Sequence, residues 1–348
     1  MTIKSLQQRI RDAADRGTPL QLRGGGSKDF YGNAPRGEPL DTRSYAGIVS
    51  YEPTELVVTA RGGTALKEVE SLLESRNQIL PFEPPHFGAG ATLGGCVAAG
   101  LSGPRRASAG ALRDFVLGVK IVDGRGRLLT FGGQVMKNVA GYDVSRLLAG
   151  SLGTLGLIAE ASLKVLPRPA AEATLRLALP EARALEAMSG WAGRPLPVSA
   201  TAWCDGVLCV RLSGAEAAVR AAAVQLGGEP ADASLWADLR EQSAPFFTGP
   251  EPLWRLALAP TAAPLALPGR QLIEWGGALR WLKSAAGADS VRDAALRAGG
   301  HATLFRATDK SPGAFAPLDA AKLRLHRSLK QAFDPAGILN PGRLYPEL

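Results

Sequence analysis

The apolar positions near the start of the chain recur every three or four residues, and charged residues fill the positions between them. The apolar stripe consists of Ile3, Leu6, Ile10 and Ala14. This spacing predicts an amphipathic helix over residues 2–16, which Gly17 and Pro19 end. The segment lacks the apolar core of a signal peptide, so we expect a cytoplasmic chain.

Short apolar runs between glycine- and proline-rich turns predict strands in the rest of the chain. The expected strands cover 20–23, 48–51, 56–60, 115–122, 127–131, 156–166, 174–179, 207–212, 253–258, 271–275, 279–282 and 301–306. Helices are expected after Thr64, after Thr92 and after Asp143, and at 181–188, 215–226, 235–242, 291–298 and 318–333. Strands and helices mix without strict alternation, which predicts an α+β fold.

Pro167-Arg168-Pro169 interrupts the chain, and the composition shifts toward Ala, Leu and Arg after it. A chain of 348 residues suits two domains. We therefore expect a first domain over 1–168, a smaller α+β cap domain over 169–316, and a C-terminal helix with its tail over 317–348. The predicted C-terminal helix has an apolar stripe of Leu318, Ala321, Leu325, Leu329 and Phe333. Its basic face of Arg324, Arg327 and Lys330 is expected to be solvated.

Charge and cysteine content exclude several classes of protein. The net charge is +8, but the basic residues are scattered, so a basic enzyme is favoured over a nucleic-acid binder. Three cysteines give neither a disulfide framework nor a metal site. No apolar run is long enough for a transmembrane helix.

Glycine changes the picture most, because 41 of the residues are glycine and many of them cluster in loops. A first loop, Gly24, Gly25, Gly26, Ser27 and Lys28, follows a strand and has the composition of an anion-binding nest. Taken alone, a tight loop without a ligand is an equally good interpretation. This loop is neither a P-loop nor a dinucleotide fingerprint.

Two further segments add to this pattern. The second loop contains Thr92, Leu93, Gly94 and Gly95, where Thr92 is expected to cap a short helix that ends near Gly100 and Gly103. The third segment contains Lys137, Gly141, Tyr142, Gly153, Gly156, Leu157 and Ile158. Its glycines would let a flat ligand lie against bare backbone, whereas close packing is the plainer alternative. Two anion-friendly loops in one domain suit a diphosphate.

These loops, in this order, resemble the FAD-binding domain of the vanillyl-alcohol oxidase/p-cresol methylhydroxylase (PCMH-type) flavoprotein family. The sequences KNVAGYD (137–143), GSLGTLG (150–156) and FDPAGILNPGRLYP (333–346) are more specific. They are similar to the FAD-binding subunits of bacterial glycolate oxidases. The resemblance implies that FAD lies between two α+β subdomains, with its pyrophosphate on the first two loops. It also implies that the tail returns to the flavin, with Asn340 and Arg343 as its polar members.

The resemblance further implies an FAD-dependent oxidoreductase that takes glycolate or a related 2-hydroxy acid. The implied partners are a larger flavoprotein subunit and an iron–sulfur subunit, through which the chain would reach the inner face of the membrane. Relatives that tether FAD covalently use His or Cys, and the first loop has neither, so we expect non-covalent FAD. Arg343 and His86 are the candidate catalytic residues, and no metal is expected.

Alternatives remain open at this stage. One is an electron-relay or non-catalytic flavin subunit of the same complex. Another is a different oxidoreductase of the same fold, such as a sugar-lactone or cell-wall-precursor flavoenzyme.

Overall fold

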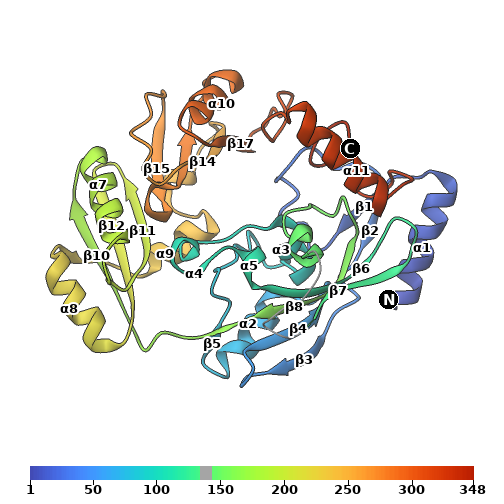
Figure 1. Cartoon of the computed structure of the whole chain (residues 1–348), viewed down its shortest axis with the longest axis horizontal. Coiled ribbons are helices and arrows are strands. Elements are labelled where there is room, and N and C mark those ends of the chain that lie inside the picture. Colours follow the sequence, from blue (N-terminus) through green and yellow to red (C-terminus); the bar gives the residue numbers. More distant parts are fainter. Residues whose placement is uncertain (134–142) are drawn as a thin grey trace.

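The computed structural model describes residues 1–133 and 143–348. In this part of the chain two lobes form, each built on its own large β-sheet (Figure 1). The first lobe comprises the described residues before 168 together with the C-terminal helix and tail. The second lobe comprises the sheet and helices of residues 171–306.

Five antiparallel strands form the sheet of the first lobe, as far as the described residues go. In spatial order they are β3 (Ile48–Glu52), β4 (Val57–Arg61), β8 (Leu157–Lys164), β6 (Val116–Val122) and β7 (Leu128–Gly132). One core joins this sheet to α2 (Leu66–Glu74) and α3 (Leu93–Ala99). The smaller elements are α4 (Arg106–Ala109), α5 (Leu112–Phe115), α6 (Val144–Leu148), and the paired strands β5 (Gln78–Ile79) and β9 (Leu166–Pro167).

A second small core ties both ends of the chain together (Figure 1). β1 (Leu20–Arg23) and β2 (Glu38–Asp41) pair in parallel, and α1 (Ile3–Arg16) packs in the same apolar cluster. Ile338 and Leu339 of the tail are buried in this cluster, and Leu339 forms a parallel bridge with Leu20. The tail therefore ends beside the strand that leads into the first glycine loop.

The described strands of the second lobe form an eight-stranded antiparallel sheet in the order β13-β10-β12-β11-β15-β16-β14-β17. The strands are β10 (Ala171–Ala178), β11 (Val198–Cys204), β12 (Val207–Gly214), β13 (Glu229–Pro230), β14 (Leu253–Ala257), β15 (Arg270–Glu274), β16 (Leu279–Lys283) and β17 (His301–Arg306). One face packs on the helices α7 (Glu181–Ala192), α8 (Glu216–Leu226) and α10 (Ala288–Arg297). The opposite face packs on α9 (Ser234–Glu241) and on first-lobe residues such as Tyr31 and Leu101.

The elements confirm most sequence expectations, with instructive exceptions. Thr64 does not cap α2: the N-cap is Ala65, and the Thr64 hydroxyl accepts from the Gly47 amide. β6 begins at Val116 because Leu112–Phe115 form a helical turn. β2 and β11 were not predicted, since β2 contains a proline and β11 is interrupted by small residues such as Ser199, Ala200 and Ala202.

The C-terminal helix α11 (Ala320–Phe333) reverses part of its predicted orientation. Leu325, expected in the buried stripe, is 60% exposed. Lys330, expected on the solvated face, is buried, and its ammonium donates to Thr154 O and Leu339 O. The helix therefore anchors the tail through a buried charge. The predicted domain boundaries at 168 and 316 stay predictions.

Candidate cofactor-binding site

The first glycine loop has five consecutive backbone amides that donate to no acceptor in the described part of the chain. Among the described residues, no acceptor takes a hydrogen bond from the amides of residues 24–28. The loop is closed by turns that begin at Gly26 and Lys28, whose carbonyls accept from Asp29 and Tyr31. Successive amides that point into one concavity bind anions, and an unsatisfied buried amide is unfavourable. The loop therefore presents a run of unused donors, which a group rich in acceptor oxygens would satisfy.

Glycine is required in this loop because the second loop lies directly on it. A Cβ at Gly25 would lie much closer than 3.0 Å to the Gly90 carbonyl oxygen. Real Cβ atoms essentially never come that close to another heavy atom. A Cβ at Gly24 would collide with Thr92 Oγ1 in the same way. Gly26 has φ +74°, which side chains disfavour. The two loops therefore form a single unit.

The second loop packs against the first loop, but the amides at its helix N-terminus already donate to acceptors within the chain. Thr92 caps α3, and its hydroxyl accepts from Gly95 N at 3.3 Å. The amides of Leu93 and Gly94 donate to Thr64 O and Gly62 O at 2.9 and 2.8 Å. The helix N-terminus is thus already satisfied within the chain. It was expected to face an anion through these amides, and the free donors lie in the first loop instead.

Two adjoining cavities run along these loops, and together they form a groove. The residues common to both cavities are Leu22, Arg23, Gly24, Gly95, Ala98, Leu152 and Asn340. At one end the groove is lined by Gly25 to Asp29 and Arg343. At the other end it is lined by Gly94, Gly153, Gly156, Leu157 and Ile158. The structure therefore brings most of the predicted site residues of all three segments to one groove.

Asn340 and Arg343 line the groove, and their side chains form hydrogen bonds with backbone groups of the chain. The Asn340 side chain accepts from Leu22 N at 2.7 Å and donates to Leu152 O at 2.6 Å. The buried Arg343 guanidinium donates to the carbonyls of Lys28, Asp29 and Asn33. Burial lowers the pKa of Arg343. These contacts assign both residues to holding the loop and groove in shape, which leaves Arg343 few free donors for a substrate.

Lys28, which lines the groove, is hydrogen-bonded to His86, which lies outside it. Lys28 Nζ donates to His86 O at 3.1 Å, and burial lowers the pKa of this lysine. His86 Nε2 lies 2.9 Å from Glu70 Oε2, and the His86 amide donates to Glu241. A histidine held between two glutamates is placed as a packing residue. It is not among the residues that line the groove.

Gly100 and Gly103 serve close packing. Gly100 ends α3 with φ +64°, and a Cβ there would press on Gly150. A Cβ at Gly103 would collide with Glu83 O. Neither residue lines the groove, although Gly103 borders a small cavity between the lobes. Lys137, Gly141 and Tyr142 lie outside the described residues.

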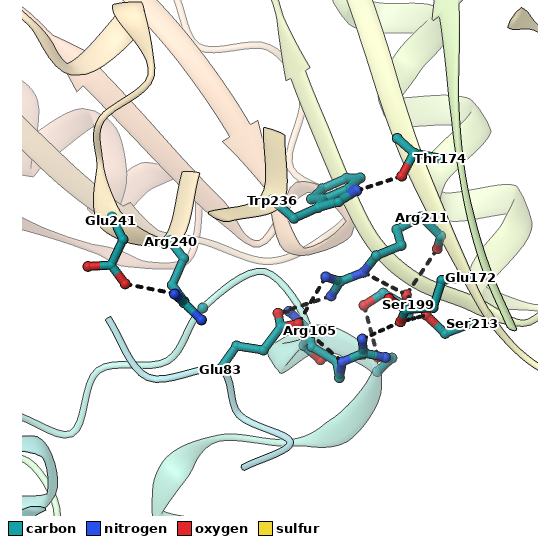
Figure 2. Close-up of polar contacts among 12 residues, drawn as sticks. Glu83, Arg105, Glu172, Thr174, Ser199, Arg211, Ser213, Trp236, Arg240 and Glu241 are labelled. Atoms are coloured by element: carbon teal, nitrogen blue, oxygen red, sulfur yellow. Dashed lines mark hydrogen bonds and ion pairs between the residues drawn. The ribbon is translucent and has the colours of Figure 1, made fainter. Parts of the chain in front are cut away.

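A buried charge network fastens the two lobes together beside this site. Figure 2 shows Glu83 of the first lobe between the guanidinium groups of Arg105 and Arg211. Glu83 Oε1 lies 3.3 Å from Arg105 Nε and 2.9 Å from Arg211 Nη1. Glu172 of β10 completes the network through Arg105 at 2.6 Å. Since the network spans both lobes, it fixes the position of the second lobe over the first.

Several residues at this junction were not found from the sequence. Arg255, Glu274 and Trp281 come from three strands of the second lobe and border the small cavity. They carry no local motif, because only the folded sheet brings them together.

Within residues 1–133 and 143–348 no group of His, Cys, Asp or Glu is arranged to hold a metal ion. In the same ranges, no helix has the length and apolar character needed to cross a bilayer.

Comparison with known proteins decides the family. Residues 1–132 match the family model described as FAD binding domain, and residues 308–344 match FAD linked oxidases, C-terminal domain. The chain is 51% identical over 345 residues to glycolate oxidase subunit GlcE of Escherichia coli K12, covering 99% of this chain and 98% of that protein. The chain belongs to the GlcE family of glycolate oxidase subunits. It is therefore an FAD-dependent oxidoreductase, and the predicted family is confirmed.

More distant relatives match a little under half of the chain. The chain is 32% identical over 159 residues to glycolate oxidase subunit GlcD of Bacillus subtilis 168, covering 45% of this chain and 34% of the relative. It is 32% identical over 162 residues to a D-lactate dehydrogenase of Archaeoglobus fulgidus, covering 46% and 36%. A solved alkyldihydroxyacetonephosphate synthase superimposes with a TM-score of 0.66 at 16% identity, covering 96% of this chain and 74% of that one. That similarity concerns the fold, and the predicted α+β architecture is confirmed.

Proposed function

We propose that this chain is the FAD-carrying subunit of a glycolate oxidase complex, which oxidises glycolate to glyoxylate and passes the electrons to partner subunits. The observation that supports it best is the set of five free amides in the first loop, inside a groove lined by all three predicted segments. The family membership supplies the reaction. FAD fits this donor set because its pyrophosphate offers the acceptor oxygens that these amides lack.

Each part of the groove has its own task in holding the cofactor. The amides of residues 24–28 bind the pyrophosphate, and the ion pair of Arg23 with Asp29 lines the same cavity. The Gly153–Ile158 wall takes a flat ring system against bare backbone. Asn340 and Arg343 keep the loop and tail in register. When FAD is bound, it supplies the hydride acceptor for the CH–OH carbon of the substrate.

The side chains near the groove support non-covalent binding. Cys96 is buried in α3, and burial raises the pKa of its thiol to about 12, so it stays unreactive. His86 is held by Glu70 and by its own backbone contacts. Neither Cys nor His lines the groove among the described residues.

We expect acid or heat precipitation of the purified protein to release all of the yellow colour into the supernatant. The physical reason is that amides and backbone contacts hold the cofactor only while the loops are folded. The absorbance of supernatant and pellet near 450 nm measures the distribution. Flavin that stays with the washed pellet would contradict this expectation.

The proposed partners are a larger flavoprotein subunit and an iron–sulfur subunit, which together bring the chain to the cytoplasmic face of the membrane. The GlcD match supports a second flavoprotein, because its name denotes another subunit of a glycolate oxidase.

A second candidate is an electron-relay subunit, in which the partner flavoprotein oxidises the substrate. The observation that favours it is the size of the small cavity between the lobes, about 20 Å³, walled by Phe87, Trp281 and Phe305. Such a space holds about one water molecule.

Anaerobic mixing of the pure chain with glycolate separates the two candidates. We expect slow bleaching of the flavin in the isolated chain, because the cavity must widen to admit the acid. The reconstituted complex is the control. Bleaching of the isolated chain at the rate of the complex supports direct oxidation by this chain, whereas reduction only after the partners are added supports the relay.

A further inference from the structure

The described residues that line the groove include three basic side chains, those of Arg23, Lys28 and Arg343. Arg23 forms an ion pair with Asp29 at 2.7 Å. The Arg343 guanidinium donates to three backbone carbonyls. Lys28 differs from both, because no carboxylate in the described part of the chain forms an ion pair with its ammonium. Lys28 is therefore a groove cation whose counter-charge must come from a ligand.

The Lys28 ammonium also keeps a donor to spare. Its closest acceptors are His86 O at 3.1 Å and Ser27 Oγ at 3.5 Å. An ammonium carries three hydrogens, so at least one is left without an acceptor. The side chain is partly buried, and burial lowers the pKa of Lys28. An anion in the groove would supply both the missing acceptor and the missing charge.

The direction of the Lys28 side chain depends on the backbone of a neighbouring turn. The carbonyl that accepts from Lys28 belongs to His86, and the amides of His86 and Phe87 both donate to Glu241 Oε2, at 3.1 and 2.9 Å. Phe87 has φ +53°, a value that costs energy in an aromatic residue. Two successive amides that converge on one carboxylate offset that cost. The turn is thus fixed by a single acidic side chain.

That side chain comes from the second lobe. Glu241 is the last residue of α9, and Arg240 Nε lies 2.8 Å from its Oε1 (Figure 2). Trp236 and Leu239 bury α9 in the apolar cluster that both lobes share. The negative charge of Glu241 also opposes the lowering of the Lys28 pKa by burial. Glu241 itself does not line the groove.

Building on the proposed function, we propose that Glu241 of the second lobe positions the Lys28 ammonium for an ion pair with the cofactor pyrophosphate. The contacts run from the Glu241 carboxylate to the backbone of His86, and from the His86 carbonyl to Lys28. Glu241 is a positioning residue, since it acts on the groove only through Lys28. The second lobe then contributes to holding the cofactor, although the unused amides all lie in the first lobe.

The test is titration of the apoprotein with FAD, followed by the change in flavin fluorescence. We expect Lys28→Met to weaken FAD binding at least about tenfold, the loss of one charge-assisted bond. Glu241→Ala should weaken it about fivefold, because Lys28 keeps its charge but loses its direction. The double variant should bind FAD no more weakly than Lys28→Met alone, since two residues that act as one unit are not additive.

The sign of the Glu241 effect separates positioning from a direct electrostatic effect. A carboxylate near a diphosphate disfavours its binding, so loss of Glu241 would tighten FAD binding if its own field were what mattered. Positioning predicts the opposite sign. Glu241→Gln keeps one acceptor oxygen for the turn and should have an intermediate affinity. Lys28→Arg keeps the charge and should recover part of the affinity that Lys28→Met loses.

Glu172→Ala is the matched control, because it removes another carboxylate at the lobe junction, one that contacts Arg105 and Ser213. It should keep the FAD affinity of the unaltered chain, even if thermal unfolding shows that the lobes are held less firmly. An equal loss of affinity in Glu172→Ala would mean that Glu241 acts by general loosening, which overturns the proposal.

The outcomes for this proposal and for the proposed function are distinguishable. If the unaltered apoprotein does not bind FAD, the proposed function fails. If it binds FAD and Glu241→Ala binds FAD equally well or more tightly, only the positioning role fails. Additive losses in the double variant also overturn the positioning role, because Glu241 and Lys28 would then act independently.

Discussion

Gly25→Ala is expected to abolish FAD retention. The new methyl group would overlap the Gly90 carbonyl oxygen, and a backbone carbonyl cannot rotate away as a flexible side chain can. The first loop must then move away from the second loop, and the amides of residues 24–28 can no longer all reach the pyrophosphate. Losing two charge-assisted hydrogen bonds corresponds to roughly 3–6 kcal/mol, which is at least about a hundredfold in affinity.

The measurement is the ratio of flavin to protein absorbance after purification, followed by titration of the apoprotein with FAD. Gly190→Ala in α7 is the matched control, since a Cβ there meets nothing within 4 Å. It should retain full flavin content. A Gly25→Ala protein that is purified with full flavin content would refute the assignment of the first loop to the pyrophosphate.

The groove could be predicted in outline because its chemistry is local. Gly24 to Lys28 are consecutive, so the sequence itself shows a run of amides without bulky side chains. The position of Thr92 as a helix cap was also predictable, because capping depends on neighbouring residues. What the sequence could not show was that α3 satisfies its own first amides through Thr64 and Gly62, which lie on another segment.

The junction between the lobes could not be predicted for the opposite reason. Arg255 and Trp275 are far from Arg106 in sequence, and neither of the two belongs to a motif in its own segment. Pairing of β14 with β16 sets Arg255 opposite Trp281, and only that register turns the arginine toward the first lobe. Sequence reasoning therefore favoured Arg343 as a catalytic candidate. In the structure, the guanidinium of Arg343 donates to backbone carbonyls instead.

The C-terminal helix shows how a periodic pattern can mislead. Leu329 and Phe333 of the predicted stripe pack against the core of the first lobe, but Leu325 of the same stripe is exposed. Lys330 decides the orientation, because its ammonium reaches two carbonyls and a buried carboxylate. A lysine in a helix pattern predicts a solvated face, and only the tertiary contacts reveal the exception.

Asp334→Ala is expected to destabilise the first lobe by about 3–5 kcal/mol, since it removes one partner of a buried ion pair. Asp334 is fully buried and lies 2.8 Å from Lys330 Nζ. It also accepts from the amides of Ile338 and Leu339, so the change frees the segment that leads to Asn340. Thermal unfolding and flavin content should fall together, because Asn340 holds two walls of the groove.

Asp319→Ala at the opposite end of α11 is the matched control for this prediction. Asp319 is an exposed N-cap that accepts from the Lys322 amide, so its loss should cost only about 1 kcal/mol and leave the flavin in place. The double change Asp334→Ala with Lys330→Met should recover part of the lost stability, because no buried charge is then left unpaired. If the double variant is as unstable as the sum of both single variants, the ion pair is not what anchors the tail, and the two amide contacts of Asp334 must carry that role alone.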